Sequence, residues 1–339
     1  LWEGRGTVIG YGRGPFAATG AAAYAGCMAS VVLGIDIGGA NLKAATADKR
    51  AVSVPFALWK EPQNLGAKLA ELAAKFPDAT EFAVTMTGEL CDCYETKRQG
   101  VTAIVNAMLG AARGFPVRIW STDGKFVTGD EAKANHLKVA AANWHALATF
   151  AGGYVREGPA ILIDTGSTTT DVIPLLDGVP VARGKTDYER LTTFELIYTG
   201  VRRTPLCAIL GFNGAAEFFA TTLDVYLILG QIAENPADTD TADGRPATRP
   251  YAFARICRML GGDAETMTAD VIQSVAEGIA EQQRNQITTA VDRATYHLEA
   301  LTGEVNRLES LSEETEPLPT IIASGSGEFL VHSTHFAAD

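Results

Sequence analysis

The sequence predicts an α/β protein built from two lobes that share one topology and enclose a central cleft. Two observations support this fold class. The chain has 339 residues, which is more than a single hydrophobic core usually accommodates. A unit of strand, Asp-x-Gly turn, two further strands and then helices occurs twice, about 130 residues apart. An internal duplication of this length indicates two related lobes.

The first copy of this unit begins with a buried strand over residues 31–36, an apolar run that ends in Asp36; Gly38 and Gly39 follow after one isoleucine. Two more strands follow through tight turns, and the apolar spacing then alternates between helical and strand periods. The expected elements are strands over 42–47, 51–56, 81–86 and 117–121, and helices over 64–76, 99–113 and 129–150.

The second copy repeats this order after a pair of glycines. Residues 160–167 read as a strand that runs into a glycine turn. An acidic stretch rich in Pro and Gly at 234–250 predicts a loop. The other expected elements are strands over 168–176, 179–184 and 319–324, with helical segments dominating 189–310.

The ends of the chain are expected to differ from the two lobes. Residues 1–30 are rich in Gly and Ala without clear periodicity, and Met28 stands just before the first strand, so we expect a non-native or disordered extension. The remaining boundaries are an N-terminal lobe over 31–155, a C-terminal lobe over 156–330 with a helical insertion at about 189–310, and a truncated tail over 331–339.

Composition limits the class of partner. The formal net charge is −12, which argues against nucleic acid or an anionic membrane as the main partner. An acidic surface still allows small phosphate ligands, because backbone amides and a metal ion can hold them locally. The five cysteines are scattered and odd in number, which indicates reduced thiols in the cytoplasm rather than a disulfide framework. The sequence has no run of about 18 apolar residues, so we expect no membrane-spanning helix.

The first glycine turn follows Asp36, which the strand delivers to the end of a sheet. Gly38 and Gly39 allow the backbone to approach an anion, and consecutive amides in such a turn form an anion-binding nest. Asn41 and Lys43 complete the candidate phosphate site, since the lysine adds a positive charge. The alternative is a β-hairpin turn with a surface lysine.

The second glycine turn repeats this arrangement in the other lobe. Asp164 and Asp171 can ligate Mg²⁺ directly or through water. The residues between them that we expect to bind phosphate are Gly166, Ser167, Thr168 and Thr170. A turn rich in Ser and Thr is the alternative, but the repetition of the motif at the same place favours phosphate binding.

A third turn, containing Gly325 and Gly327, follows the last strand and can clasp a nucleotide or another flat ligand. Together the three turns resemble the phosphate-1, phosphate-2 and adenosine motifs of the actin, heat-shock-protein and sugar-kinase superfamily. This resemblance implies an actin-like ATPase fold, a ribonuclease H-like βββαβα unit present twice around a cleft.

A narrower resemblance covers about residues 31–330. It rests on the stretches MTGELCDCYETKRQGV (86–101), ELIYTGVRRTPLCAI (195–209), FATTLDVYLILG (219–230) and TADGRPATRPYAFARICRML (241–260). They resemble hydantoinase/oxoprolinase-related proteins described as tetrahydromethanopterin-linked C1-transfer pathway proteins. Archaeal members are synthases of methanofuran biosynthesis, which join an aminomethylfuran diphosphate to the phenol of γ-glutamyltyramine and release pyrophosphate.

This resemblance implies a small-molecule diphosphate and a phenolic acceptor as substrates, with Mg²⁺ as cofactor. Asp36 and Asp164 are then candidate metal ligands, and Asp171 is the first candidate for the catalytic base, although the three roles are interchangeable. Arg202 and Arg203 are candidate phosphate ligands, because guanidinium groups bind phosphate bidentately. The alternative for the two arginines is a structural or solvated pair.

Other charged residues in the family-like stretches allow two interpretations. Glu89, Glu95 and Lys97 line the cleft or belong to a charged surface loop, and the same two interpretations apply to Asp243 and Arg245. The sequence does not decide between them.

Three further functions fit the same fold. One is an ATP-dependent small-molecule kinase, and another is ATP-driven opening of an oxoproline- or hydantoin-like amide. The third is a nucleotide-dependent assembly module without catalysis. The stretch 268–310 packs within the chain or pairs with a second copy, so a homo-oligomer is one expected state.

Overall fold

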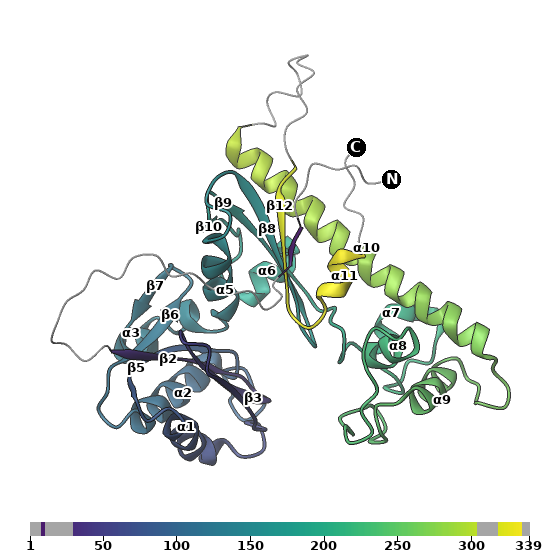
Figure 1. Ribbon diagram of the computed structural model, residues 1–339, viewed down its shortest axis with the longest axis horizontal. Helices are drawn as coiled ribbons and strands as arrows, with labels where there is room; N and C mark the ends of the chain where they lie inside the picture. The colour runs from purple at the N-terminus through teal and green to yellow at the C-terminus, as the bar shows by residue number, and fades with distance from the viewer. Residues whose placement is uncertain (1–7, 11–29, 304–317, 334–339) are drawn as a thin grey trace. The chain divides into compact units, whose positions relative to one another are not determined.

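The computed structural model describes residues 8–10, 30–303 and 318–333 (Figure 1). These residues form two compact units, each with its own sheet and core. The N-terminal unit contains residues 30–153 and 184–189. The C-terminal unit contains the other described residues.

The N-terminal unit is built on a six-stranded sheet in the order β4-β3-β2-β5-β6-β7. β2 pairs antiparallel with β3 and parallel with β5, which pairs parallel with β6. Strand alternation separates two faces, because Leu33, Ile35 and Ile37 are buried while Gly34 and Asp36 on the opposite face are half-buried. The strands are β2 (Val31–Ile37), β3 (Asn41–Thr46), β4 (Ala51–Pro55), β5 (Ala79–Met86), β6 (Val117–Ser121) and β7 (Lys125–Val127).

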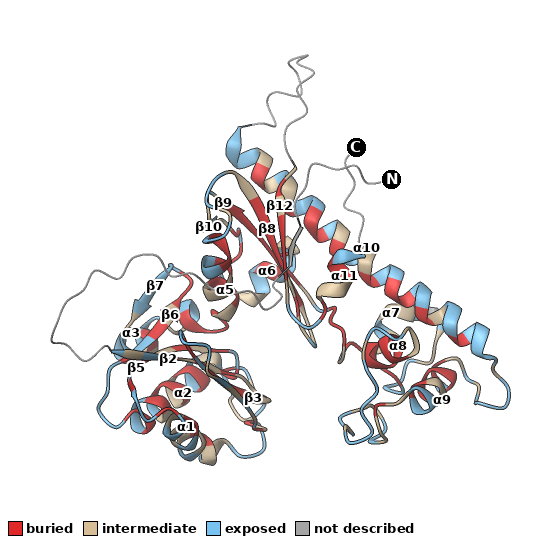
Figure 2. Ribbon diagram, viewed as in Figure 1, coloured by how far each residue is buried: buried red, intermediate tan, exposed pale blue. Residues whose placement is uncertain are grey.

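Helices α1 (Leu65–Ala74) and α2 (Lys97–Ala111) follow the short 3-10 helix η1 (Pro62–Asn64) in the N-terminal unit. They contribute Leu69 and Ile104 to the core of this unit. Both helices carry buried positions (Figure 2). The remaining helices are α3 (Gly129–Ala134), α4 (His136–Val139) and α5 (Asn143–Gly152).

The prediction of one helix over 129–150 is wrong. α3 begins at a capping box formed by Thr128 and Glu131, in agreement with the sequence. It ends because Asn135 leaves the helical region, with φ −112° and ψ 46°. Ala141 then adopts a φ of 49°, which lies outside the right-handed helical region, and α5 starts afresh two residues later.

The sheet of the C-terminal unit has the order β1-β12-β8-β9-β10, and β11 also pairs with β9. β8 pairs antiparallel with β9 and parallel with β12, as β2 does with β3 and β5. The duplication and the α/β fold class expected from the sequence are therefore confirmed. The strands are β1 (Val8–Gly10), β8 (Pro159–Thr165), β9 (Thr170–Leu176), β10 (Val179–Pro180), β11 (Leu196–Ile197) and β12 (Thr320–Ser324).

Strand β1 comes from the segment that the sequence analysis expects to be an extension. It pairs parallel with β12, the place that β6 takes beside β5 in the other sheet. Every other residue of 1–29 lies outside the described residues, as does 334–339 of the expected truncated tail.

The helical segments of the C-terminal unit pack largely against one long helix, α10 (Ala269–Thr302). Its buried residues recur at helical spacing, from Ile272 through Ile279 to Leu298, and form a continuous buried stripe (Figure 2). The loop predicted over 234–250 is observed over 234–248, and residues 249 and 250 begin the helix that follows. The other helices are α7 (Leu206–Leu210), η2 (Gly211–Asn213), α8 (Thr222–Ile228), α9 (Arg249–Met259) and α11 (Glu328–His332). The remaining helix, α6 (Asp187–Thr193), begins in residues assigned to the N-terminal unit and ends in the C-terminal unit.

No helix in the described part of the chain combines the length and apolar character needed to cross a membrane.

Candidate active site

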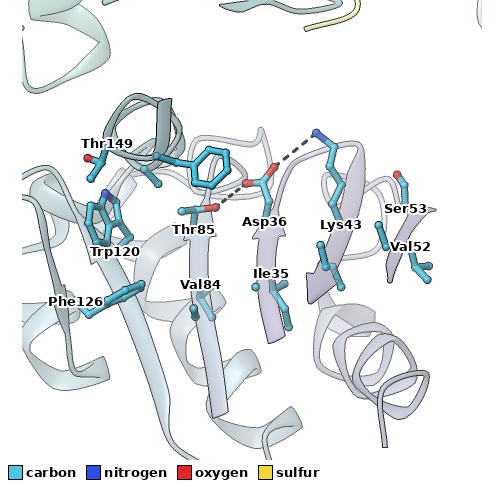
Figure 3. Close-up of a pocket in the computed structure, with 17 residues that line it drawn as sticks. Ile35, Asp36, Lys43, Val52, Ser53, Val84, Thr85, Trp120, Phe126 and Thr149 are labelled. Carbon is cyan, nitrogen blue, oxygen red and sulfur yellow. Dashed lines mark hydrogen bonds and ion pairs between the residues drawn. The ribbon is translucent and has the colours of Figure 1, made fainter. Parts of the chain in front are cut away.

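The first predicted glycine turn joins β2 to β3. The Gly38 amide donates to the Asn41 carbonyl at 3.0 Å and closes the turn. Asp36 and Lys43 lie opposite each other in the strand register, and the Lys43 Nζ is 3.7 Å from Asp36 Oδ2 (Figure 3). The Thr85 hydroxyl donates to Asp36 Oδ1 at 3.1 Å. The strand pairing thus brings the predicted carboxylate and the predicted lysine together.

The second glycine turn has the same backbone geometry in the C-terminal unit. The Gly166 amide donates to the Thr169 carbonyl at 2.8 Å, and Asp164 lies opposite Asp171 in the register of β8 and β9. Asp164 therefore corresponds to Asp36 in the other unit, whereas the place of Lys43 is taken by a second carboxylate.

Two segments distant in sequence pack against the second turn. The amides of Arg202 and Arg203 donate to the Ser167 carbonyl at 3.0 and 2.8 Å. Gly325 has a φ of +91°, and a Cβ at this position would lie 2.3 Å from the Thr165 carbonyl oxygen. The structure therefore brings the predicted residues 164–171, 202–203 and 325–327 together.

The side chains of the two arginines are occupied by the acidic loop. The Arg202 guanidinium lies 2.8 Å from Asp238 Oδ2, and that of Arg203 lies 3.5 Å from Asp240 Oδ2. Their backbone contacts support the turn, and their charge is balanced by these aspartates. A phosphate would have to compete with both carboxylates for the guanidinium groups.

The hydroxyl groups of the second turn differ in accessibility. Ser167 is exposed and Thr168 is half-buried, so both remain candidates for phosphate binding. Thr170 is fully buried, and its hydroxyl donates to the Thr199 carbonyl at 2.7 Å. The predicted phosphate role does not fit Thr170, because this hydroxyl supports the turn from within the core.

Asp171, the first candidate for the base, is held by a buried arginine. The Arg190 Nη2 donates to Asp171 Oδ1 at 2.5 Å and to the Glu195 carbonyl at 3.0 Å. The Arg190 side chain is only 2% exposed. The Arg190 guanidinium therefore already occupies one oxygen of the Asp171 carboxylate. No sequence motif pointed to Arg190, which is distant from Asp171 in the chain.

A second position that the sequence analysis missed is Gln283 on α10. Its side-chain amide is fully buried and donates to the Thr199 hydroxyl at 2.8 Å and to the Gly200 carbonyl at 3.0 Å. The Tyr226 hydroxyl donates to its side-chain oxygen at 2.6 Å. These bonds tie α10 to the segment that packs against Ser167. In the sequence, Gln283 is one polar residue in a long helical stretch, and no motif there indicates that its side chain would be buried and hydrogen-bonded.

A hollow of about 930 Å³ lies on the sheet face that carries Asp36 and Lys43 (Figure 3). Its floor is apolar, because Gly34 stands in register with Ala45 on β3 and with Ala83 on β5. Aromatic rings line the other end, contributed by Trp120, Phe126 and Phe150. This volume and this apolar lining with few polar groups are typical of small-molecule sites.

Glu89 lies in a family-like stretch for which the sequence left two interpretations open. The structure excludes a surface position, since Glu89 is only 1% exposed and its Oε2 has no hydrogen-bond partner among the described residues. Burial raises the pKa of Glu89 to about 7, although the Ala141 amide and the charge of Lys97 act in the opposite direction.

The raised pKa of Glu89 makes the stability of the chain depend on pH. The unfolded carboxyl, with a pKa of 4.5, releases its proton before the folded one does, so the free energy of unfolding falls between pH 4.5 and about 7. In the Glu89→Gln variant the side chain cannot ionise, so this loss of stability does not occur. The free energy of unfolding of the variant should exceed the wild-type value by about 3 kcal/mol at pH 8 and match it near pH 4.

Chemical denaturation of both proteins across this pH range measures the difference. The exposed Glu95→Gln is the matched control, because Glu95 lies in the same loop and should give a pH dependence parallel to wild type. A Glu89→Gln curve that also runs parallel to wild type would contradict the assigned burial.

Metal ligands are sparse in each unit. Among the described residues, no group of three or more His, Cys, Asp or Glu side chains is arranged to hold a metal ion. Asp36 and Asp164 each offer one carboxylate beside a glycine turn. Mg²⁺ commonly binds through one or two carboxylates together with substrate phosphates and waters. Among the described residues, each of these turns therefore offers a metal ion a single carboxylate and no all-protein cage.

Comparison with known proteins identifies the relatives of this chain. A model of the hydantoinase/oxoprolinase family matches residues 81–334. The chain belongs to the hydantoinase/oxoprolinase family. This family member is 35% identical over 292 residues to the (4-{4-[2-(gamma-L-glutamylamino)ethyl]phenoxymethyl}furan-2-yl)methanamine synthase of Methanocaldococcus jannaschii, covering 81% of this chain and 86% of the relative. It is 41% identical over 124 residues to the synthase of that name from Methanococcus vannielii, covering 34% of this chain and 55% of that one.

Solved structures similar to this family member share little sequence with it. MreB5 of Spiroplasma citri bound to ADP has a TM-score of 0.42 at 13% identity, covering 88% of this chain and 85% of that chain. Nucleotide-free acetone carboxylase has a TM-score of 0.41 at 12% identity, covering 81% and 63%. The fold assignment of this family member rests on the duplicated strand order described above.

Proposed function

We propose that this chain is a transferase that forms an aryl ether between a furan-bearing methyl carbon and a phenol oxygen. The similarity to the Methanocaldococcus jannaschii synthase carries this proposal, because that protein's name describes a phenoxymethyl group attached to a furan. The substrates are an aminomethylfuran diphosphate and γ-glutamyltyramine or a tyrosine-like acceptor, as in methanofuran-type cofactor biosynthesis.

The reaction requires one bond to form and one to break at the same carbon. The phenol oxygen forms a bond to the furfuryl carbon, and the bond from this carbon to the diphosphate oxygen breaks. The electron pair leaves with pyrophosphate, and the phenol proton passes to a base. The furan ring stabilises positive charge on the carbon, so the site must chiefly stabilise the leaving diphosphate and accept the proton.

The glycine turns supply the groups for the leaving diphosphate in this proposal. Backbone amides in the turns after Asp36 and Asp164 are donors for phosphate oxygens, and the exposed Lys43 adds a cation. Asp36 is the proposed Mg²⁺ ligand of the N-terminal unit, and Asp164 is the proposed ligand of the C-terminal unit. A bound Mg²⁺ would supply charge neutralisation to a diphosphate. Ser167 and Thr168 add hydroxyl donors at the second turn.

The aromatic end of the hollow suits the planar furan of the donor. Trp120, Phe126 and Phe150 offer ring faces and edges for stacking, at the same sheet face as Asp36. The proposed partners are these small molecules, without nucleic acid or membrane. The proposed compartment is the cytoplasm, and a homo-oligomer remains part of the proposal.

Incubation of the purified chain with both substrates and Mg²⁺ tests this function. Mass spectrometry should detect the ether product, and pyrophosphate should appear in equal amount. Consumption of ATP without formation of the ether would instead favour a kinase or an ATP-driven amidohydrolase, the other functions that fit the family.

A further inference from the structure

A buried carboxyl lies beside the first glycine turn, at the end of β5. The amides of Thr87 and Gly88 donate to the Ile37 carbonyl at 2.9 and 3.1 Å, so the loop after β5 is fixed to the end of β2. Glu89 follows directly, and its backbone packs against Gly100 of α2 with no space for a side chain between them. The position of Glu89 relative to the Gly38 turn is therefore set by the backbone.

Positive charge gathers in front of this carboxyl. Helix α2 begins with Lys97 and Arg98 and has no acidic residue in its first turn, although the amino end of a helix already carries partial positive charge. The Lys97 Nζ lies 3.2 Å from Asp187 Oδ2, and the two side chains are 20% and 28% exposed. The charge of Lys97 acts on the Glu89 carboxyl and opposes the rise of its pKa.

The other candidate bases already have partners. Asp36 is bound by Lys43 and Thr85, and Asp171 is bound by Arg190. Glu89 Oε2 has no hydrogen-bond partner among the described residues. A general base works best when its pKa lies near the operating pH, and burial raises the pKa of Glu89 to about 7.

We propose that Glu89 accepts the proton of the phenolic acceptor, with the Lys97 ammonium beside the phenol oxygen and Asp187 orienting Lys97. This inference rests on the proposed ether synthesis and replaces Asp171 as the base. The phenol O–H bond breaks towards Glu89 Oε2 while the phenol oxygen bonds to the furfuryl carbon and pyrophosphate departs. Protonated Glu89 then returns the proton to solvent.

Lys97 and Asp187, whose charges act on Glu89, are partly exposed, whereas Glu89 itself is buried. Catalytic hydrogen bonds of this kind tighten when substrate binds. The titratable groups whose charges interact with Glu89 are Lys97 on α2, Asp187 and, in its own loop, Cys91.

The test compares wild type, Glu89→Gln, Glu89→Asp and the control Glu95→Gln in the ether-forming assay across pH 5–9. For wild type, kcat/KM should fall below about pH 7 as Glu89 takes up a proton. Glu89→Gln should lose roughly 10²- to 10⁴-fold in kcat and lose this acidic limb, with little change in the KM for the diphosphate. Glu89→Asp should retain part of the activity, and Glu95→Gln all of it.

A folded Glu89→Gln enzyme with wild-type kcat and an unchanged acidic limb would overturn the proposal. If wild type forms no ether at all, the proposed function fails, and the site is judged separately by carbon-13 NMR of labelled glutamate. Addition of γ-glutamyltyramine should then shift the Glu89 titration but not that of Glu95. An unchanged Glu89 titration would reject the phenol site as well.

Discussion

Replacing Gly100 with alanine is expected to destabilise the N-terminal unit severely. Gly100 lies in α2, and a Cβ built on it would meet the Glu89 carbonyl oxygen at 2.0 Å and the Glu89 Cα at 2.7 Å. Both contacts involve backbone atoms, which cannot rotate away as a side chain can. The free energy of unfolding should fall by about 3 kcal/mol or more, because either α2 or the Glu89 loop must move.

The same helix provides the control for this substitution. A Cβ on Gly110 would meet nothing within 4 Å, so Gly110→Ala should raise the free energy of unfolding by up to about 1 kcal/mol through helix propensity. Urea denaturation of both variants measures the contrast. Equal effects of the two substitutions would show that the loop holding Glu89 is not packed on α2 as described.

The second large effect is expected in the C-terminal unit, at the buried ion pair of Asp224 and Arg255. Arg255 Nε donates to Asp224 Oδ1 at 2.8 Å, and its Nη1 donates to Asp243 Oδ1 at 2.9 Å. The side chains of Arg255 and Asp224 are 0% and 1% exposed. Asp224→Asn removes one charge and leaves the guanidinium under-compensated in the core, so the free energy of unfolding should fall by roughly 3–5 kcal/mol.

A double variant separates the charge effect from the loss of packing. Asp224→Asn combined with Arg255→Met removes both charges and should recover most of the stability that Asp224→Asn loses. At the exposed pair of Lys68 and Glu71, which are 37% and 62% exposed, Glu71→Gln should leave the free energy of unfolding nearly unchanged, because solvent screens the two charges. Failure of the double variant to recover stability would show that packing, rather than charge, dominates at Asp224.

The sequence by itself predicted the two sheets and their duplication. Each strand of the repeated unit shows apolar alternation or a buried apolar run, and a glycine turn follows the first strand of each copy. These signals are local. The pairing of Asp36 with Lys43 follows from the same information, because a tight turn fixes which residues face each other across a hairpin. Local signals were misleading over 129–150, where Asn135 and Ala141 interrupt an Ala-rich stretch that reads as helix.

Only the tertiary structure decided which charged residues are free to act. Asp171 is held by Arg190, and the guanidinium of Arg202 is held by Asp238. Arg255 binds both Asp224 and Asp243, although the sequence left a surface position open for Asp243. Glu89 stands in a loop whose sequence is charged throughout, yet its backbone packs against Gly100 and its carboxyl is buried. Burial and ion pairing determine the protonation state of a carboxyl, and both depend on residues that folding brings together from distant segments. The spacing of residues in the sequence shows only which groups are neighbours along the chain.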